Sequence, residues 1–136
     1  MEWLSHRLDQ KDRNQNPFRR AAEHLFAELQ QRMEDALQIY NRRSGRPGNE
    51  IAYIQNNIVR FGTADAAGNK TQTPGSASIN LTLGSAIITA DYSQGGPPVL
   101  FTIEADENGY LKLKKGNDVV SVDKATELIL SGFLFS

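Results

Sequence analysis

His24 and Glu28 are the residues whose types and spacing come nearest to a metal site. They stand four positions apart in a segment with helical periodicity, so both side chains can share one helix face. A metal ion needs three or four protein ligands, and the other histidine, His6, lies where no further ligand can be identified. The pair therefore predicts a solvated helix surface, with no metal and no other cofactor.

Nucleophilic, acid–base and phosphate chemistry find no better support. No G-x-S-x-G elbow follows an apolar strand, and both histidines lie in the first half of the chain, away from the predicted strands. The paired carboxylates Glu34-Asp35 and Asp106-Glu107 fall on a helix surface and in a hairpin loop, where water keeps both groups ionised. Gly84 and Gly95-Gly96 stand between predicted strands, whereas a phosphate-binding loop joins a strand to a helix. We expect that the chain is not an enzyme.

Composition and charge limit the classes of protein to which this chain can belong. The chain has 136 residues, a net charge of −1 and no cysteine, which describes one small domain without disulfides or thiolate sites. Residues 1–48 carry a net charge of +2 and residues 49–136 a net charge of −3, so no strongly basic region exists. Because basic and acidic residues are nearly balanced, we do not expect nucleic-acid binding. The basic pairs Arg19-Arg20 and Arg42-Arg43 bracket one helix and could contact an acidic partner.

Apolar runs in this sequence are short. None approaches the roughly 20 residues that cross a bilayer, and residues 1–16 lack the unbroken apolar core of a signal peptide. We therefore expect no membrane association and a cytoplasmic location.

The strongest periodic signal is a long helix that starts at Asn16-Pro17 and ends near Arg43. Asparagine can cap the free amides of a helix, and proline at the first helical position loses no needed hydrogen bond. Glycine and proline in residues 44–48 then end the helix. Its apolar stripe repeats at steps of three and four: Phe18, Ala22, Leu25, Leu29, Met33, Ala36 and Tyr40.

The second half of the chain changes to the period of two that is typical of strands. Residues 77–83 and 86–92 alternate around Gly84-Ser85, which predicts a two-residue turn with Leu83 opposite Ala86 and Leu81 opposite Ile88. Residues 99–105 and 110–115 predict a second hairpin, with a three-residue loop that ends at a left-handed Gly109.

In that second hairpin Ile103 faces Leu113 and Ala105 faces Leu111. Glu104 lies opposite Lys112, which predicts a surface ion pair between them.

Weaker patterns complete the second half. Residues 56–62 favour a strand, residues 51–55 fit a helix or a strand, and residues 63–75 predict a polar loop. Val119, Val120 and Val122 predict a short strand or extended connection. Asp123 can cap a closing helix, whose apolar positions repeat at helical spacing.

Together these elements predict an α+β fold of two layers. A long N-terminal helix packs on an antiparallel meander of about five strands, and a C-terminal helix closes the domain. Residues 1–16 form a short amphipathic N-terminal segment, and residues 17–136 form a single α+β domain.

Apolar residues at the two ends of the chain favour association. Residues 128–135 are nearly all apolar, and the N-terminal segment adds Trp3, Leu4 and Leu8. One small core does not accommodate all of these large side chains. We expect a non-catalytic protein-interaction module that binds a protein partner or itself as a homodimer; the alternative is a small apolar-ligand carrier with a pocket between helix and sheet. The candidate interface residues are Trp3, Leu4, Leu8, Leu130, Leu134 and Phe135.

Overall fold

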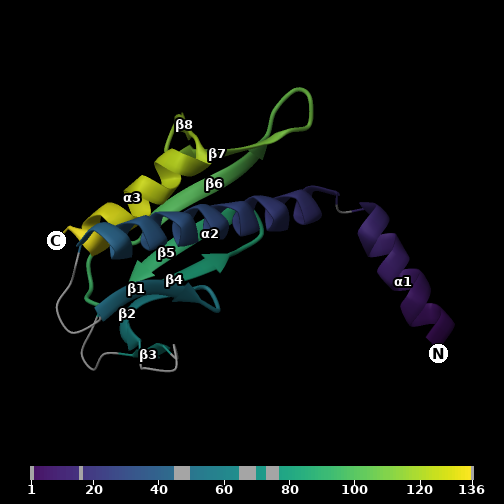
Figure 1. Ribbon diagram of the computed structural model, residues 1–136. Coiled ribbons are helices and arrows are strands. Elements are labelled where there is room, and N and C mark those ends of the chain that lie inside the picture. The colour runs from purple at the N-terminus through teal and green to yellow at the C-terminus, as the bar shows by residue number, and fades with distance from the viewer. Residues whose placement is uncertain (1, 16, 45–49, 65–69, 73–76, 136) are drawn as a thin grey trace.

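The α+β fold predicted from the sequence is confirmed. The computed structural model describes residues 2–15, 17–44, 50–64, 70–72 and 77–135. Figure 1 shows two layers, with a long helix and the closing helix side by side on one face of a curled antiparallel sheet. The first helix extends away from this body.

Three helices and eight strands make up the described part of the chain. The helices are α1 (Glu2–Gln15), α2 (Pro17–Ser44) and α3 (Val122–Leu134). The strands are β1 (Glu50–Gln55), β2 (Ile58–Ala64), β3 (Lys70–Gln72), β4 (Ser78–Leu83), β5 (Ile87–Tyr92), β6 (Val99–Ala105), β7 (Leu111–Lys115) and β8 (Asp118–Val120).

The sheet is a meander in which each strand pairs with a neighbour in sequence order. The order is β1-β2-β4-β5-β6-β7-β8, and β3 pairs with β2 outside this path. The prediction of about five strands was therefore too low, because short strands lie in segments that lack a long alternating pattern. Twist accumulated over so many strands curls the sheet around the two helices (Figure 1).

The long helix α2 begins at Pro17 as predicted and runs the length of the sheet. Asn16, the predicted cap, and residues 45–48, the predicted turn, lie outside the described residues. The buried stripe is rotated slightly from the predicted one, so that Ala36 and Tyr40 lie at its edge and are only partly buried. Its centre consists of Ala22, Phe26, Leu29, Met33 and Leu37.

The predicted register of the β4–β5 hairpin was wrong by two residues. Leu83 pairs with Ile88 and Leu81 with Ala90. The Gly84 amide donates a hydrogen bond to the Ile87 carbonyl at 2.8 Å, so the turn consists of Ser85 and Ala86, one position later than predicted. A shift of two keeps every side chain on its face, so the buried pattern of Ile79, Leu81, Ile88 and Ala90 survives the error.

The β6–β7 hairpin is confirmed in register and in loop. Ile103 pairs with Leu113, and Gly109 has a φ of 82°, the left-handed conformation that the three-residue loop requires. The Asp106 carboxylate accepts hydrogen bonds from the amides of Asn108 and Tyr110, which holds the loop closed. These two hydrogen bonds give the Asp106 carboxylate a structural role in the loop.

The ion pair predicted on this hairpin has a different partner. Glu104 lies opposite Lys112 in register, but its carboxylate contacts the ammonium of Lys114 at 3.1 Å, on the diagonal. Partly exposed pairs of this kind contribute at most about 1 kcal/mol to stability.

Residues 51–55, left open between helix and strand, form most of β1. Asn56 and Asn57 both have positive φ, at 52° and 66°, which makes the tight turn that joins β1 to β2. The polar loop predicted over residues 63–75 is wrong in part, since β2 continues to Ala64 and β3 occupies Lys70–Gln72. The short strand predicted at Val119, Val120 and Val122 is confirmed in part, since β8 covers Val119 and Val120 whereas Val122 begins α3.

The cap of α3 also differs from the prediction. The Ser121 hydroxyl accepts a hydrogen bond from the Lys124 amide at 3.0 Å, so Ser121 is the cap and Asp123 lies in the first turn. An acidic residue in the first turn still favours the helix through its dipole.

Asn41 closes the free edge of β1 from the side of α2. Its side chain accepts a hydrogen bond from the Ala52 amide at 2.8 Å and donates one to the Ala52 carbonyl at 2.7 Å. Both backbone groups of an edge-strand residue are therefore satisfied by a helix instead of by another strand.

Replacing Asn41 by alanine should lower the free energy of unfolding by about 1–3 kcal/mol, because two partly buried hydrogen bonds are lost. Urea denaturation followed by circular dichroism measures the loss. Gln38→Ala, at an exposed position one turn earlier on α2, is the control and should change stability by less than about 0.5 kcal/mol. Equal effects of the two substitutions would contradict the structural role of Asn41.

Candidate functional site

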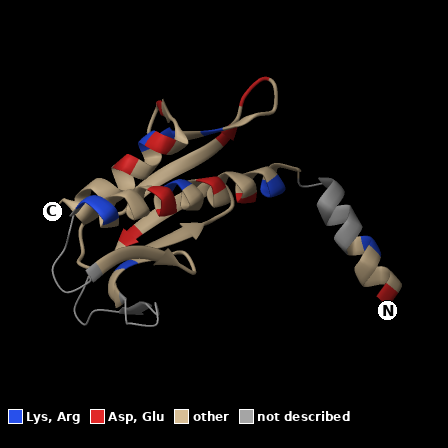
Figure 2. Ribbon diagram, viewed as in Figure 1, with Lys and Arg blue, Asp and Glu red and all other residues tan. Residues whose placement is uncertain are grey.

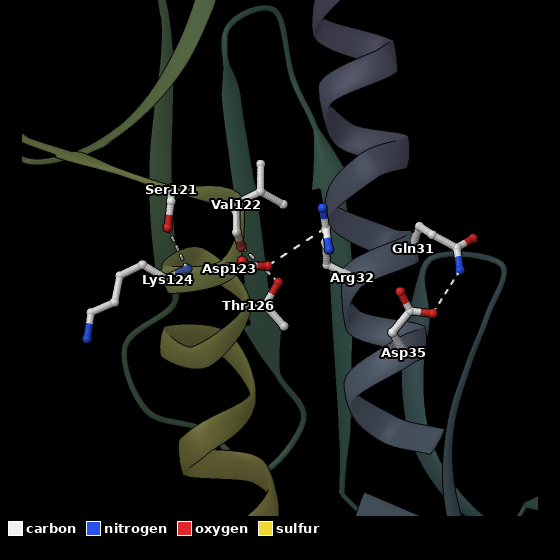
Figure 3. A network of polar contacts seen from close by, with 8 residues as sticks. All are labelled: Gln31, Arg32, Asp35, Ser121, Val122, Asp123, Lys124 and Thr126. Carbon is white, nitrogen blue, oxygen red and sulfur yellow. Dashed lines mark hydrogen bonds and ion pairs between the residues drawn. The ribbon is translucent and has the colours of Figure 1, made fainter. Parts of the chain in front are cut away.

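The two helices that cover the sheet meet along a seam with polar contacts at one end. Figure 3 shows Arg32 of α2 reaching Asp123 of α3, with 3.7 Å between guanidinium Nε and carboxylate Oδ1. On α3 itself the Thr126 hydroxyl donates to the Val122 carbonyl at 2.9 Å. Both charged groups are more than half exposed, so this pair orients the helices more than it stabilises them.

The inner face of α3 is fixed to the sheet. Ile129 is fully buried, and its carbonyl accepts a hydrogen bond from the Tyr92 hydroxyl of β5 at 2.7 Å. Phe133 stacks on Phe61 of β2 with ring centroids 4.5 Å apart. These contacts hold α3 at a defined position beside α2.

Burial raises the pKa of the Tyr92 hydroxyl above its ordinary value of 10.0. The protonated hydroxyl can therefore donate to Ile129 throughout the neutral range. Because the folded-state pKa is the higher one, the contribution to stability is complete below the unfolded-state pKa and is lost as pH rises through the folded-state pKa.

The outer side of the same seam forms an apolar groove of about 470 Å³ that opens to solvent. Two aromatic rings meet at one end of it, where Tyr40 and Phe135 contact edge to face with centroids 6.1 Å apart. α2 contributes Ala36, Ile39, Tyr40 and Arg43, and the C-terminal segment contributes Thr126, Glu127, Leu130, Ser131, Leu134 and Phe135.

Charge at the groove is confined to two side chains of opposite sign. Arg43 comes from the last turn of α2, and Glu127 comes from the first half of α3. Since the helices run side by side with their C-terminal ends together, Arg43 lies toward one end of the groove and Glu127 toward the other (Figure 1). The apolar lining suits an apolar helix or a small apolar molecule.

Three of the sequence-predicted interface residues line this groove. Phe135 is 75% exposed and Leu134 is half-buried, whereas Leu130 is 3% exposed and joins the core. The expectation that Leu130 is hard to bury within one chain was wrong, because α2 covers it. Its place at the floor of the groove keeps it among the predicted interface residues.

The α2 half of the groove was not predicted. Ala36 and Tyr40 were assigned to the core stripe, and Ile39 was not singled out, although it is 49% exposed. An isoleucine off the stripe, one position before an edge tyrosine, is the signal that could have indicated a second apolar surface.

The other three predicted interface residues lie on α1, apart from the groove of the same chain. Trp3, Leu4 and Leu8 are 64%, 40% and 52% exposed. Their spacing places them on one side of the helix. Figure 1 shows α1 directed away from the sheet and from the other two helices. The α1 helix spans Glu2–Gln15 and so takes up nearly all of the predicted amphipathic segment of residues 1–16.

The remaining chemical candidates are dispersed. His24 and Glu28 are both exposed on α2, and His6 is exposed on α1. Within the described ranges, no group of three or more His, Cys, Asp or Glu side chains could hold a metal ion. Figure 2 shows acidic and basic residues interspersed along α2, and Arg19 pairs with Glu23 at 3.5 Å.

Two further surfaces bear on binding. The outer face of the sheet exposes Ile87, Leu100 and Tyr110 among polar residues. A second hollow of about 470 Å³, with a more polar lining, lies between the start of α2 at Phe18 and the β4–β5 connection at Ser85.

None of the helices in the described part of the chain is long and apolar enough to cross a membrane.

The fold and the groove define a small α+β domain in which two helices lie on a curled meander sheet. Comparison with protein-family models finds no matching family, and comparisons with curated proteins and with solved structures find no significant match. The groove is the feature of this fold that is suited to binding a partner.

Proposed function

We propose that this chain is a non-catalytic protein-interaction module that associates with itself through the groove between α2 and α3. The apolar lining of an open groove carries the proposal, because large apolar side chains such as Phe135 and Ile39 remain in contact with water. Covering such a surface is favourable by about 25 cal/mol for each Å² of apolar area.

The position of α3 supports the proposal. Its inner face is anchored by Ile129 and Phe133, so the outer face is held rigid before any partner arrives. A preformed surface loses little conformational freedom on binding, which favours recognition. Absence of enzymatic activity, a cytoplasmic location and little affinity for nucleic acid belong to the same proposal and rest on the sequence reasoning.

Replacing Leu134 and Phe135 by aspartate should convert the self-associated protein to a monomer, because two charges would be placed in an apolar interface. Native mass spectrometry and sedimentation measure the subunit number. Ile87→Asp with Leu100→Asp adds the same charge to the outer face of the sheet and should leave self-association intact. If the groove variant associates like the wild type, the groove is not the interface.

A small apolar-ligand carrier is the second candidate. The hollow between α2 and the β4–β5 connection favours it, since its volume of about 470 Å³ lies within the range of small-molecule sites. Native mass spectrometry of gently purified protein would detect a bound molecule as extra mass lost on denaturation. Recovery of the bare subunit mass, together with no stabilising compound in a thermal-shift panel, would remove this candidate.

A further inference from the structure

We propose that the groove between α2 and α3 receives helix α1 of a second copy of this chain, and that two chains exchange their α1 helices reciprocally. This inference rests on the proposed self-association and names its occupant. Two apolar surfaces of the same chain carry it: the groove, and the face of α1 that bears Trp3, Leu4 and Leu8.

Geometry excludes the chain's own α1 from the groove. The helix joins α2 at Pro17, and Trp3 lies 12 residues before Gln15, which corresponds to about 18 Å of helix. The groove begins at Ala36, about 29 Å along α2 from Pro17. If α1 folded back as a helix, Trp3 would stop short of the groove. A second copy has no such limit.

The length of the groove sets the area that the exchange buries. Its α3 side runs from Thr126 to Phe135, about 14 Å of helix, so about that length of α1 can lie in it. Half the surface of such a length of a helix about 10 Å across is roughly 210 Å², and both surfaces of two reciprocal contacts give about 850 Å². This area is typical of a weak, reversible dimer, and a single docked helix would bury about half as much, so the reciprocal arrangement is the favoured one.

Charge complementarity sets the direction of the docked helix. Glu2 and Arg7 lie near the start and the middle of α1, and the groove carries Arg43 and Glu127 at separate positions along its length. Arg7 borders the apolar face of α1, whereas Glu2 lies on the opposite side of the helix, so Arg7 is the charge that can meet Glu127, with the first turn of α1 toward the Arg43 end of the groove. The N-terminus of α1 then meets the C-terminal ends of α2 and α3, and α3 has no basic residue in its last turn to offset its dipole.

Complementation between two defective variants tests the exchange. The α1 variant carries Trp3→Asp and Leu8→Asp, and the groove variant carries Leu134→Asp and Phe135→Asp. Each variant alone should dimerise at least about 30-fold more weakly than the wild type, since apolar anchors are replaced by charge. Their one-to-one mixture should associate more tightly than either variant alone but more weakly than the wild type, because only the mixed pair has one contact between an intact α1 and an intact groove.

Cysteine trapping gives an independent readout, because the natural chain has no cysteine. A Leu4→Cys chain mixed with a Ser131→Cys chain should form a mixed disulfide under mild oxidation. A Thr82→Cys chain, exposed on the outer face of the sheet, replaces Ser131→Cys as the control and should not be trapped. Predominant Leu4→Cys homodimers would overturn the exchange in favour of contacts between two α1 helices.

The outcomes separate this inference from the function on which it rests. If the groove variant loses dimers while the α1 variant keeps them, the groove is an interface but α1 is not its occupant. If both variants dimerise like the wild type, or if the wild type is monomeric at every concentration, self-association through the groove and the exchange both fail.

Discussion

Replacing Phe101 by alanine is expected to lower the free energy of unfolding by about 3–5 kcal/mol. The side chain is fully buried on β6, near the middle of the sheet, and pairs across the strands with Ile88, which is also fully buried. Alanine removes a large apolar surface and leaves a cavity that the surrounding strands cannot close, because each is held by neighbours on both sides.

The adjacent residue supplies a matched control. Leu100 lies on the same strand but on the outer face and is 49% exposed, so Leu100→Ala should cost less than about 1 kcal/mol. Urea denaturation of both variants gives the two values in the same experiment. Phe101→Leu, which keeps more of the volume, should fall between them and remains measurable if the alanine variant does not fold. Similar losses at positions 100 and 101 would contradict the assignment of faces.

This contrast between neighbours is the part of the fold that the sequence predicts best. Alternation decides which face of a strand is buried, and it does so even where the pairing was wrong, since a shift of two residues preserves the faces of β4 and β5. The β6–β7 register was predictable because the turn itself is local and requires a left-handed glycine at Gly109.

The errors arise where a turn signal is misleading or weak. Gly84 indicated a turn at Gly84-Ser85, but Gly84 flanks the turn and bonds to Ile87, so the turn lies at Ser85-Ala86. The turn at Asn56 and Asn57 was missed because asparagine adopts positive φ less readily than glycine and gives a weaker signal. Without that turn, β1 could not be distinguished from a helix.

The groove also combines residues that the sequence indicates with residues that only the structure reveals. Leu134 and Phe135, which line the groove, could be singled out from the sequence, because the apolar run that contains them exceeds what one helix face buries. Ile39 and Arg43 could not, because their role depends on the position of α3 beside α2. That position is set by contacts of α3 with the sheet, such as the hydrogen bond from Tyr92 to Ile129.

Ile129→Ala is therefore the substitution that tests whether the groove is preformed. The side chain is fully buried beneath α3, and its truncation should lower the free energy of unfolding by about 2–5 kcal/mol. Denaturant unfolding measures the total loss, and hydrogen exchange of the α3 amides reports whether the helix opens separately.

Ser131→Ala is the matched control, since Ser131 is exposed on the groove side of the same helix and should change stability by less than about 0.5 kcal/mol. A large effect at Ile129 with little at Ser131 means that α3 uses one face for the core and leaves the other for a partner. If Ile129→Ala were as mild as Ser131→Ala, α3 would be detachable, and the groove would form only when a partner helix held α3 in place. Binding would then include the cost of ordering α3, and truncation of Ile129 would weaken dimers without destabilising the monomer.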